Sequence, residues 1–355
     1  MTQAPWVHIV GGGLAGLSLA RELALYSSLP GAVVISEARE GYQDDRTFSF
    51  WCQESQQAFL KPQSLCPDWR IGDANQSYLM RGHHYSYATR SSIDFYDEAL
   101  GVIADHPAVE WRRQRVEAPP QAKFVFDSRP PSVAEFRVVQ SFHGMTVQLE
   151  RPHGLTAVGL MEDLQVVDGR VRFRYVVPLG ANQVLIEHTE FSGTPSDLDS
   201  LQQLNKDWCI SRFANGWTEL RQEQAHIPMG IRSQGQDLGI PIGTRGGMAR
   251  DSTGYSYVSI QRWAQQAAHQ MVSRQHYTPH RRPAWEQWMD QMLLRLIEQR
   301  PDCVPNIFCA LARNLSADAF ARFMMNQTPM DALRIVAASP KKPFVLALAG
   351  RPQWI

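Results

Sequence analysis

The hydrophobic pattern at the start of the chain predicts a strand, a helix and a second strand. Residues 6–10 (WVHIV) form a short apolar run, and residues 17–23 follow with the spacing of a helix that has one apolar face. A second apolar run, residues 32–36, is rich in valine and isoleucine, which favour strands. Such a β-α-β unit is typical of a parallel sheet.

The middle of the chain predicts long strands of an antiparallel sheet. Three runs, residues 136–142, 171–177 and 183–189, are enriched in β-branched and aromatic residues. The turn sequence Gly-Ala-Asn at 180–182 separates the last two runs, which therefore predict a hairpin.

The last third of the chain predicts helices. Apolar residues recur there at three- and four-residue spacing, which places them on one helix face. The clearest stripe consists of Trp285, Trp288, Met289, Met292, Leu293, Leu296 and Ile297. Such a stripe usually packs in a core, and the wall of a lipid-accepting cavity is the alternative.

These patterns predict an α/β (α+β) fold with a Rossmann-type dinucleotide-binding domain. That domain is expected to be discontinuous, residues 1–130 and 235–275, because glycine-rich sequence returns between 239 and 247. Residues 131–234 would form an inserted antiparallel-sheet domain that accepts the substrate, and residues 276–355 a helical C-terminal region.

Composition narrows the class of protein. The 355 residues carry a formal net charge of zero, which gives no electrostatic reason to expect nucleic acid as a partner. The five cysteines include no C-x-x-C pair and are expected to be reduced thiols of a cytoplasmic protein. No apolar run reaches the ~18–20 residues of a transmembrane helix, and no signal peptide is expected before the first strand.

The first chemistry that the sequence predicts is dinucleotide binding. Gly11, Gly13 and Gly16 form G-x-G-x-x-G between a predicted strand and a predicted helix. In this motif the first glycine allows a tight turn, the second admits a pyrophosphate and the third lets the helix pack closely. The N–H groups of the first helical turn, including Ala15, would face the phosphates. Glu37 ends the second strand, where an acidic residue binds a ribose hydroxyl.

Glycine-rich turns also occur in ordinary α/β proteins, so the flanking elements are needed for this interpretation. No metal site is expected, because the histidine pairs at 83–84 and 276/280 lack acidic or cysteine partners at ligand spacing.

Segments along nearly the whole chain share residues with one family. They are the glycine motif at 11–16, and residues 45–50 (DRTFSF), 127–129 (DSR), 161–162 (ME), 172–179 (RFRYVVPL), 185–189 (LIEHT), 227–229 (IPM), 243–255 and 333–343. In this order they resemble the motifs of the bacterial lycopene cyclases, flavoproteins that close the ionone rings of carotenoids. The chain departs from the family motifs at Phe48 (tryptophan in the family), His188 (an acid), Ala225 (glycine) and Asp251 (proline).

The resemblance implies FAD as the cofactor, active in its reduced form, with NAD(P)H needed only to reduce it. The second flavin segment of the family matches residues 243–255, so the resemblance implies cofactor contacts from Gly243, Gly247, Thr253 and Gly254. A reduced, anionic flavin would stabilise a nearby carbocation.

Three polar residues have two open interpretations each. Arg46 is a candidate for the cofactor phosphates, or forms a salt bridge on the surface. Asp127 and Arg129 are candidates for the flavin or its ribityl chain, or belong to a turn at a strand end.

Cyclisation of a polyene end group needs a proton donor held in a dry site. Glu187 lies in an apolar strand, where desolvation would raise its pKa and keep it neutral. By resemblance it aligns with the catalytic acid of the family motif F-L-E-E-T. The alternative is a glutamate that faces solvent or pairs with Arg174 across the hairpin. His188 would point to the opposite face and serve packing or hydrogen bonding.

The family resemblance implies a redox-neutral isomerase that acts on a hydrophobic linear polyene, with lycopene to β-carotene as the expected reaction. The alternatives are an FAD-dependent monooxygenase or isoprenoid reductase on the same scaffold, a cyclase of another terpenoid, and a flavin-binding protein without catalysis. The insolubility of a polyene implies peripheral association with the inner face of the cell membrane. The sequence makes no prediction of oligomeric state.

Overall fold

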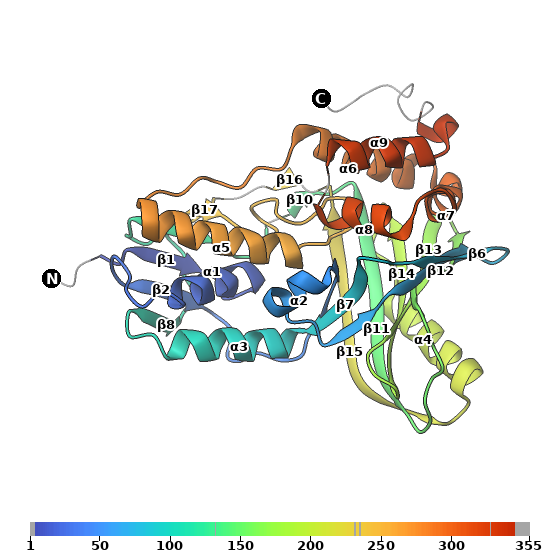
Figure 1. Ribbon diagram of the computed structural model, residues 1–355, viewed down its shortest axis with the longest axis horizontal. Helices are drawn as coiled ribbons and strands as arrows, with labels where there is room; N and C mark the ends of the chain where they lie inside the picture. Colours follow the sequence, from blue (N-terminus) through green and yellow to red (C-terminus); the bar gives the residue numbers. More distant parts are fainter. Residues whose placement is uncertain (1–3, 132, 231, 234–235, 327, 345–355) are drawn as a thin grey trace. The chain divides into compact units, whose positions relative to one another are not determined.

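The computed structural model describes residues 4–344 except 132, 231, 234–235 and 327 (Figure 1). The chain divides into two compact units, each built from three segments. Unit 1 consists of Met1–Phe48, Arg90–Glu135 and Arg232–Pro283, and unit 2 of Ser49–Thr89, Phe136–Ile231 and Ala284–Ile355. The chain passes from one unit to the other within strands β3 (Thr47–Cys52) and β7 (Ser86–Ser91).

Unit 1 is built on a parallel sheet with the strand order β17-β9-β1-β2-β8. These strands are β1 (Val7–Val10), β2 (Val33–Glu37), β8 (Val109–Arg113), β9 (Phe124–Asp127) and β17 (Ile240–Pro241). Every residue of β1 and β2 is buried, as is usual for the strands of a parallel sheet. Two short strands, β10 (Val133–Glu135) and β16 (Arg232–Ser233), pair with each other.

Three helices of unit 1 pack side by side: α1 (Leu14–Ala24), α3 (Ser92–Ala104) and α5 (Tyr257–Arg274) (Figure 1). The predicted helix after the glycine motif is therefore confirmed. The mixed α/β fold class is confirmed as well.

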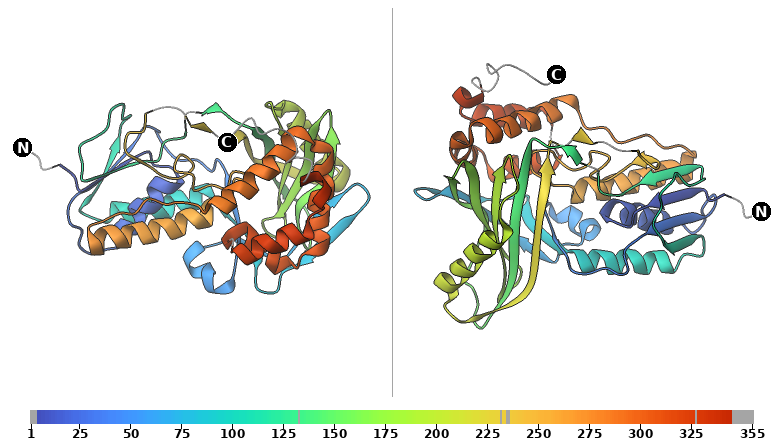
Figure 2. Two further views of the ribbon diagram at one scale, coloured as in Figure 1. Left: turned by 90° about the horizontal axis from the view of Figure 1, so that it is seen from above. Right: turned by 180° about the vertical axis from the view of Figure 1, so that it is seen from behind.

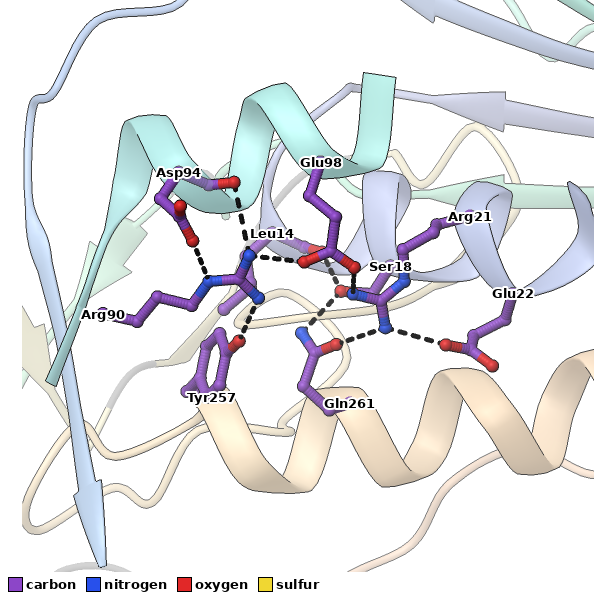
Figure 3. Close-up of polar contacts among 9 residues, drawn as sticks. All are labelled: Leu14, Ser18, Arg21, Glu22, Arg90, Asp94, Glu98, Tyr257 and Gln261. Atoms are coloured by element: carbon purple, nitrogen blue, oxygen red, sulfur yellow. Dashed lines mark hydrogen bonds and ion pairs between the residues drawn. The ribbon is translucent and has the colours of Figure 1, made fainter. Parts of the chain in front are cut away.

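A buried polar network joins these three helices (Figure 3). The guanidinium group of Arg90 donates to Asp94 at 2.7 Å, to Glu98, and to the Tyr257 hydroxyl at 3.1 Å. Arg21 on α1 donates to Gln261 on α5 at 2.8 Å. Since both arginines are buried, their charges need these partners, and the partners come from different helices.

Unit 2 is built on a large sheet with the strand order β15-β11-β14-β13-β12-β5-β6. These strands are β5 (Asp68–Asp73), β6 (Ser77–Arg81), β11 (Val138–Leu149), β12 (Val158–Val167), β13 (Arg170–Pro178), β14 (Gln183–Ser192) and β15 (Trp217–Met229). Neighbouring strands are antiparallel except β12 and β5, which run parallel. The predicted hairpin is confirmed as β13 and β14.

The remaining elements of unit 2 are mostly helical. They are α2 (Glu54–Leu60), β4 (Ser64–Cys66), α4 (Leu198–Phe213), α6 (Ala284–Gln299), the 3₁₀ turn η1 (Pro301–Cys303), α7 (Val304–Asn314), α8 (Ala317–Asn326) and α9 (Pro329–Ala338). From the predicted stripe, Met292 and Leu296 are buried in a core with residues of α7, α8 and α9. That part of the stripe therefore packs as core, whereas Trp288 is exposed.

The compact units differ from the predicted domain ranges in two places. Residues 49–89 belong to unit 2, because β5 pairs with β12 and thereby extends the large sheet. The C-terminal helices also belong to unit 2, because α7 packs on β5 and β6. Short-range hydrophobic patterns do not encode these long-range pairings.

Helix α4 covers one face of the large sheet (Figure 2). Met145, Ile186 and Cys209 contribute to the apolar core between them. A hydrogen-bonded chain lies beside this core: the Asn205 amide on α4 bonds His188 Nδ1 at 2.8 Å and His143 Nδ1 at 3.0 Å. All three side chains are buried, so Asn205 fixes α4 to the sheet through polar groups that water does not reach.

We expect Asn205→Ala to lower the free energy of unfolding by about 2 kcal/mol, since two buried imidazoles lose a partner. Urea denaturation of the variant measures this loss. Gln203→Ala, at an exposed position of the same helix, is the matched control and should change stability by less than about 0.5 kcal/mol. Equal stability of the two variants would contradict the assigned role of Asn205.

Candidate functional site

The glycine motif of unit 1 forms the turn between β1 and the N-terminus of α1. A Cβ atom at Gly16 would overlap the carbonyl oxygen of Gly11, so the helix approaches the strand as the motif predicts. Gly13 is the N-cap of α1 and has no side chain to bond the first-turn N–H groups. The Gly16 N–H donates to the Ser128 hydroxyl at 3.1 Å. The helix thus begins with backbone donors and a positive dipole end, the features that bind phosphate.

The carboxylate of Glu37 lies beside this turn. It accepts hydrogen bonds from the backbone N–H of Gly12 at 2.7 Å and from that of Arg39 at 2.8 Å. The guanidinium group of Arg39 lies 3.2 Å from the same carboxylate. Burial acts to raise the pKa of Glu37, but these donors hold it below its usual range. The Tyr42 hydroxyl donates to the Gly12 carbonyl at 2.7 Å. Glu37 therefore stays ionised at the expected ribose position.

The second glycine-rich segment approaches the same helix terminus. A Cβ atom at Gly243 would lie 3.0 Å from the Cβ of Ala15 in the first turn of α1. Farther along this segment, Gly247 and Gly254 have positive φ angles of 68° and 73°. Within the described part of the chain, the Thr253 hydroxyl is buried and has no hydrogen-bond partner. An unpaired buried hydroxyl in this segment suits a ligand that supplies the missing partner.

The structure gives Asp127 and Arg46 different surroundings. Asp127 is fully buried at the end of β9 and accepts the Arg129 guanidinium at 2.6 Å and the Leu238 N–H at 3.0 Å. Burial acts to raise the pKa of Asp127, but Arg129 and the backbone donors lower it below its usual range. Arg46 forms a bidentate ion pair with Asp45 near the surface. Both residues thus have protein partners, and cofactor contacts for them remain predictions.

The face of the large sheet opposite α4 carries Glu187. Side chains alternate along β14, so Glu187 points away from the face where Ile186 and His188 pack against α4. The Thr189 hydroxyl donates to Glu187 Oε1 at 2.6 Å. On β13, Tyr175 pairs directly with Glu187, and its hydroxyl bonds to that of Tyr87 at 2.7 Å.

Loss of hydration sets the protonation state of Glu187. Water reaches part of the side chain, but the surrounding protein desolvates the carboxyl group and raises its pKa to about 8. The Thr189 hydrogen bond acts in the opposite direction, and the nearby charge of Glu223 adds to the increase. At neutral pH the carboxyl group therefore carries a proton that it can donate.

The alternative pairing of Glu187 with Arg174 does not occur. Arg174 is adjacent to Tyr175 on β13 and so points to the other face, where it pairs with Glu162 at 3.4 Å and lies over the Trp208 ring. His188 also lies on that face, as the alternation predicts. Burial lowers the pKa of His188 to about 4, so the imidazole is neutral and serves as a hydrogen-bonding group.

Several residues around these sites were missed by the sequence analysis. Ser128 lies in the Asp-Ser-Arg segment, whose position at a strand end was a usable signal. Tyr42, Thr189 and Glu223 contact their sites through turns and strand pairing. Thr189 ends the LIEHT segment that resembles the family motif F-L-E-E-T, whereas no short motif marks Tyr42 or Glu223.

Among the residues with defined positions, no cluster of histidine, cysteine and acidic side chains could hold a metal ion. Across the same residues, no helix has the length and hydropathy needed to cross a membrane.

The fold, with its Rossmann-type nucleotide domain, is similar to that of the flavin-dependent brominase Bmp2, with a TM-score of 0.60 and 13 % identity over 94 % of this chain and 98 % of that protein. Across 98 % of this chain it matches a geranylgeranyl bacteriochlorophyll reductase-like protein from Thermoplasma acidophilum, with a TM-score of 0.60, 11 % identity and 99 % of that protein covered. It also matches p-nitrophenol 4-monooxygenase from Pseudomonas putida, with a TM-score of 0.57, 14 % identity and 98 % of each chain covered.

Residues 115–349 match the family described as lycopene cyclase protein, and the chain belongs to this family. Lycopene beta-cyclase from Paracoccus sp. is 26 % identical over 287 residues, which cover 70 % of this chain and 69 % of that enzyme. Lycopene beta-cyclase from Pseudescherichia vulneris is 29 % identical over 273 residues, with the same coverage. The resemblance inferred from the motifs is therefore confirmed.

We expect Thr189→Val to raise the pKa of Glu187 above 8, by up to about one pH unit, because the carboxylate loses a hydrogen-bond donor. The carbonyl infrared band of a protonated carboxyl group follows this titration, and its absence in Glu187→Gln assigns it. Thr189→Ser keeps the hydroxyl group and should titrate like the wild type. A lower pKa in the valine variant would contradict the assignment of this hydrogen bond.

Proposed function

We propose that this protein catalyses the redox-neutral cyclisation of a linear polyene end group, with lycopene as substrate and β-carotene as product. Membership of the lycopene cyclase family and the names of the curated relatives support this proposal. The observation that carries it is the Glu187 carboxyl group, which stays protonated near pH 7 on a sheet face away from α4. In mechanistic class the enzyme is an isomerase, because the product has the mass of the substrate.

Glu187 acts as the general acid in this proposal. Its proton passes to a terminal C=C of the polyene, and the resulting tertiary carbocation is attacked by the next double bond to close a six-membered ring. A proton then leaves the ring, so one proton enters and one leaves. A desolvated carboxyl group suits this task, since its neutral form is stable and can donate a proton.

FAD is the proposed cofactor, held by unit 1. The first turn of α1, Glu37, the Gly243 segment and the Thr253 hydroxyl provide the donors and acceptors that such a dinucleotide requires. Reduced flavin supplies negative charge that stabilises a carbocation. NAD(P)H is the proposed reductant. The proposed setting is the cytoplasm, with peripheral contact to the membrane that dissolves the polyene.

The test is expression in a lycopene-accumulating bacterium with separation of the pigments by chromatography and mass detection. Wild type should convert lycopene into cyclic products of unchanged mass, and Glu187→Gln should reduce conversion by at least about 100-fold. Glu219→Gln removes a carboxylate from an exposed site on β15 and should keep wild-type conversion.

Two outcomes would contradict the proposal. Full conversion by Glu187→Gln would remove Glu187 as the acid. If the wild type binds flavin but leaves lycopene unchanged, the substrate would be another terpenoid. If product formation also consumes NAD(P)H stoichiometrically, the enzyme would instead be a monooxygenase or a reductase.

Gly16→Ala should abolish flavin binding, because its Cβ would overlap the Gly11 carbonyl and displace the start of α1. The flavin absorbance of the purified protein, with circular dichroism as the check on folding, measures the result. Gly101→Ala is the matched control, since a Cβ at this exposed position of α3 meets no other atom within 4 Å. Normal flavin content in Gly16→Ala would argue against the proposed cofactor site.

A further inference from the structure

A second carboxyl group lies on the same sheet face as Glu187. On β11, Gly144 pairs with Glu187 of β14 on one side and with Glu223 of β15 on the other. Side chains of directly paired residues in antiparallel strands point to the same face. Glu187 and Glu223 are thus two strands apart on one face, separated by a residue without a side chain.

The missing side chain at Gly144 brings the two acids toward each other. A Cβ atom there would lie 2.9 Å from the Cγ of Glu223 and 3.4 Å from its Oε1. The Glu223 side chain therefore extends across Gly144, in the direction of β14. Any larger residue at this position would occupy the space that Glu223 fills.

Arg221 is a cationic partner of Glu223. The Arg221 guanidinium lies 3.4 Å from Glu223 Oε2 and 3.4 Å from the Thr146 hydroxyl, on the same sheet face. Glu223 is only 7 % exposed, and a buried carboxylate is stable when a cation lies beside it. Glu187, by contrast, has a hydroxyl donor at 2.6 Å. The two acids thus have different partners, a guanidinium group beside Glu223 and a hydroxyl group beside Glu187.

We propose that Glu223 is a positioning residue for Glu187: a carboxylate held across Gly144 that keeps the proton on the catalytic acid until substrate takes it. This inference rests on the proposed function and adds a residue to it. In each cycle Glu187 gives its proton to the substrate carbon and, as a carboxylate beside Glu223, regains a proton readily.

The charged groups on the elements that pack against β14 support this assignment. Around Glu187, β13 contributes the phenol of Tyr175, and β15 contributes Arg221 and Glu223. Helix α4 lies on the other face of the sheet. The charged residues of α4 are Asp199, Lys206, Asp207 and Arg212. Helix α6 also packs on β14, and its charged residues are Glu286, Asp290, Arg295 and Glu298. The charge of Glu223 raises the pKa of Glu187.

The decisive experiment is an infrared pH titration of the Glu187 carbonyl band in the whole protein, without substrate. Glu223→Gln removes the charge but keeps the shape, so the midpoint should fall by about one pH unit or more. Glu219→Gln removes an exposed charge of the same strand and should leave the midpoint unchanged. An unchanged midpoint in Glu223→Gln would overturn the proposal.

Activity provides the second measurement. Cyclisation needs the protonated acid, so conversion falls as pH rises through the Glu187 pKa, and this decline should move to lower pH in Glu223→Gln. If that variant fails to fold, Gly144→Ala replaces it: the added Cβ displaces Glu223, and the midpoint should again fall. An unchanged midpoint there overturns the proposal. A wild type that titrates as expected but leaves lycopene unchanged contradicts the proposed substrate, whereas the link between the two acids stands.

Discussion

The chemistry of unit 2 depends on the alternation of side chains along β14. This strand carries two titratable residues in succession, Glu187 and His188, and a regular strand must send them to opposite faces. One face is packed against α4, so the histidine becomes a neutral member of a buried hydrogen-bonded chain. The other face holds the carboxyl group, which desolvation keeps protonated. The same environment that disfavours charge thus produces a structural histidine and an acid.

Unit 1 depends on a different constraint, the burial of two arginine charges. Arg21 and Arg90 find their acceptors on α1, α3 and α5, so a shift of any one of these helices would break hydrogen bonds to a buried charge (Figure 3). Because α1 is one of the three, the network also fixes the helix whose N-terminus offers donors to phosphate. The polar core and the proposed cofactor site are therefore parts of one arrangement.

The two acids on the large sheet illustrate how a protein separates the roles of like groups. Glu223 has a guanidinium partner, whereas Glu187 has a hydroxyl donor and a desolvating environment. The glycine between them permits their approach without adding a side chain of its own. Differences in surroundings, and not in residue type, underlie the different roles that we propose for the two carboxyl groups.

Local sequence was sufficient for some of these features. The G-x-G-x-x-G motif between a strand and a helix predicted the turn at Gly11–Gly16, because glycine requirements there are set by neighbours in the chain. The composition of 183–189 predicted the strand and the apolar setting that raises the pKa of Glu187, and the alternation of side chains in a strand predicted the opposite directions of Glu187 and His188. The family motifs predicted the family to which the chain belongs.

Other features required the tertiary structure, because strand register and long-range pairing determine them. Glu223 lies 36 residues after Glu187, and only the pairing of β11 with both β14 and β15 brings them together. The extension of the large sheet by β5, and the partners that occupy Asp127 and Arg46, follow from similar contacts. The sequence by itself thus determined the local elements and pointed to Glu187 as the candidate acid. The tertiary structure decided which groups surround that acid, since a residue's neighbours across a sheet depend on register and not on sequence distance.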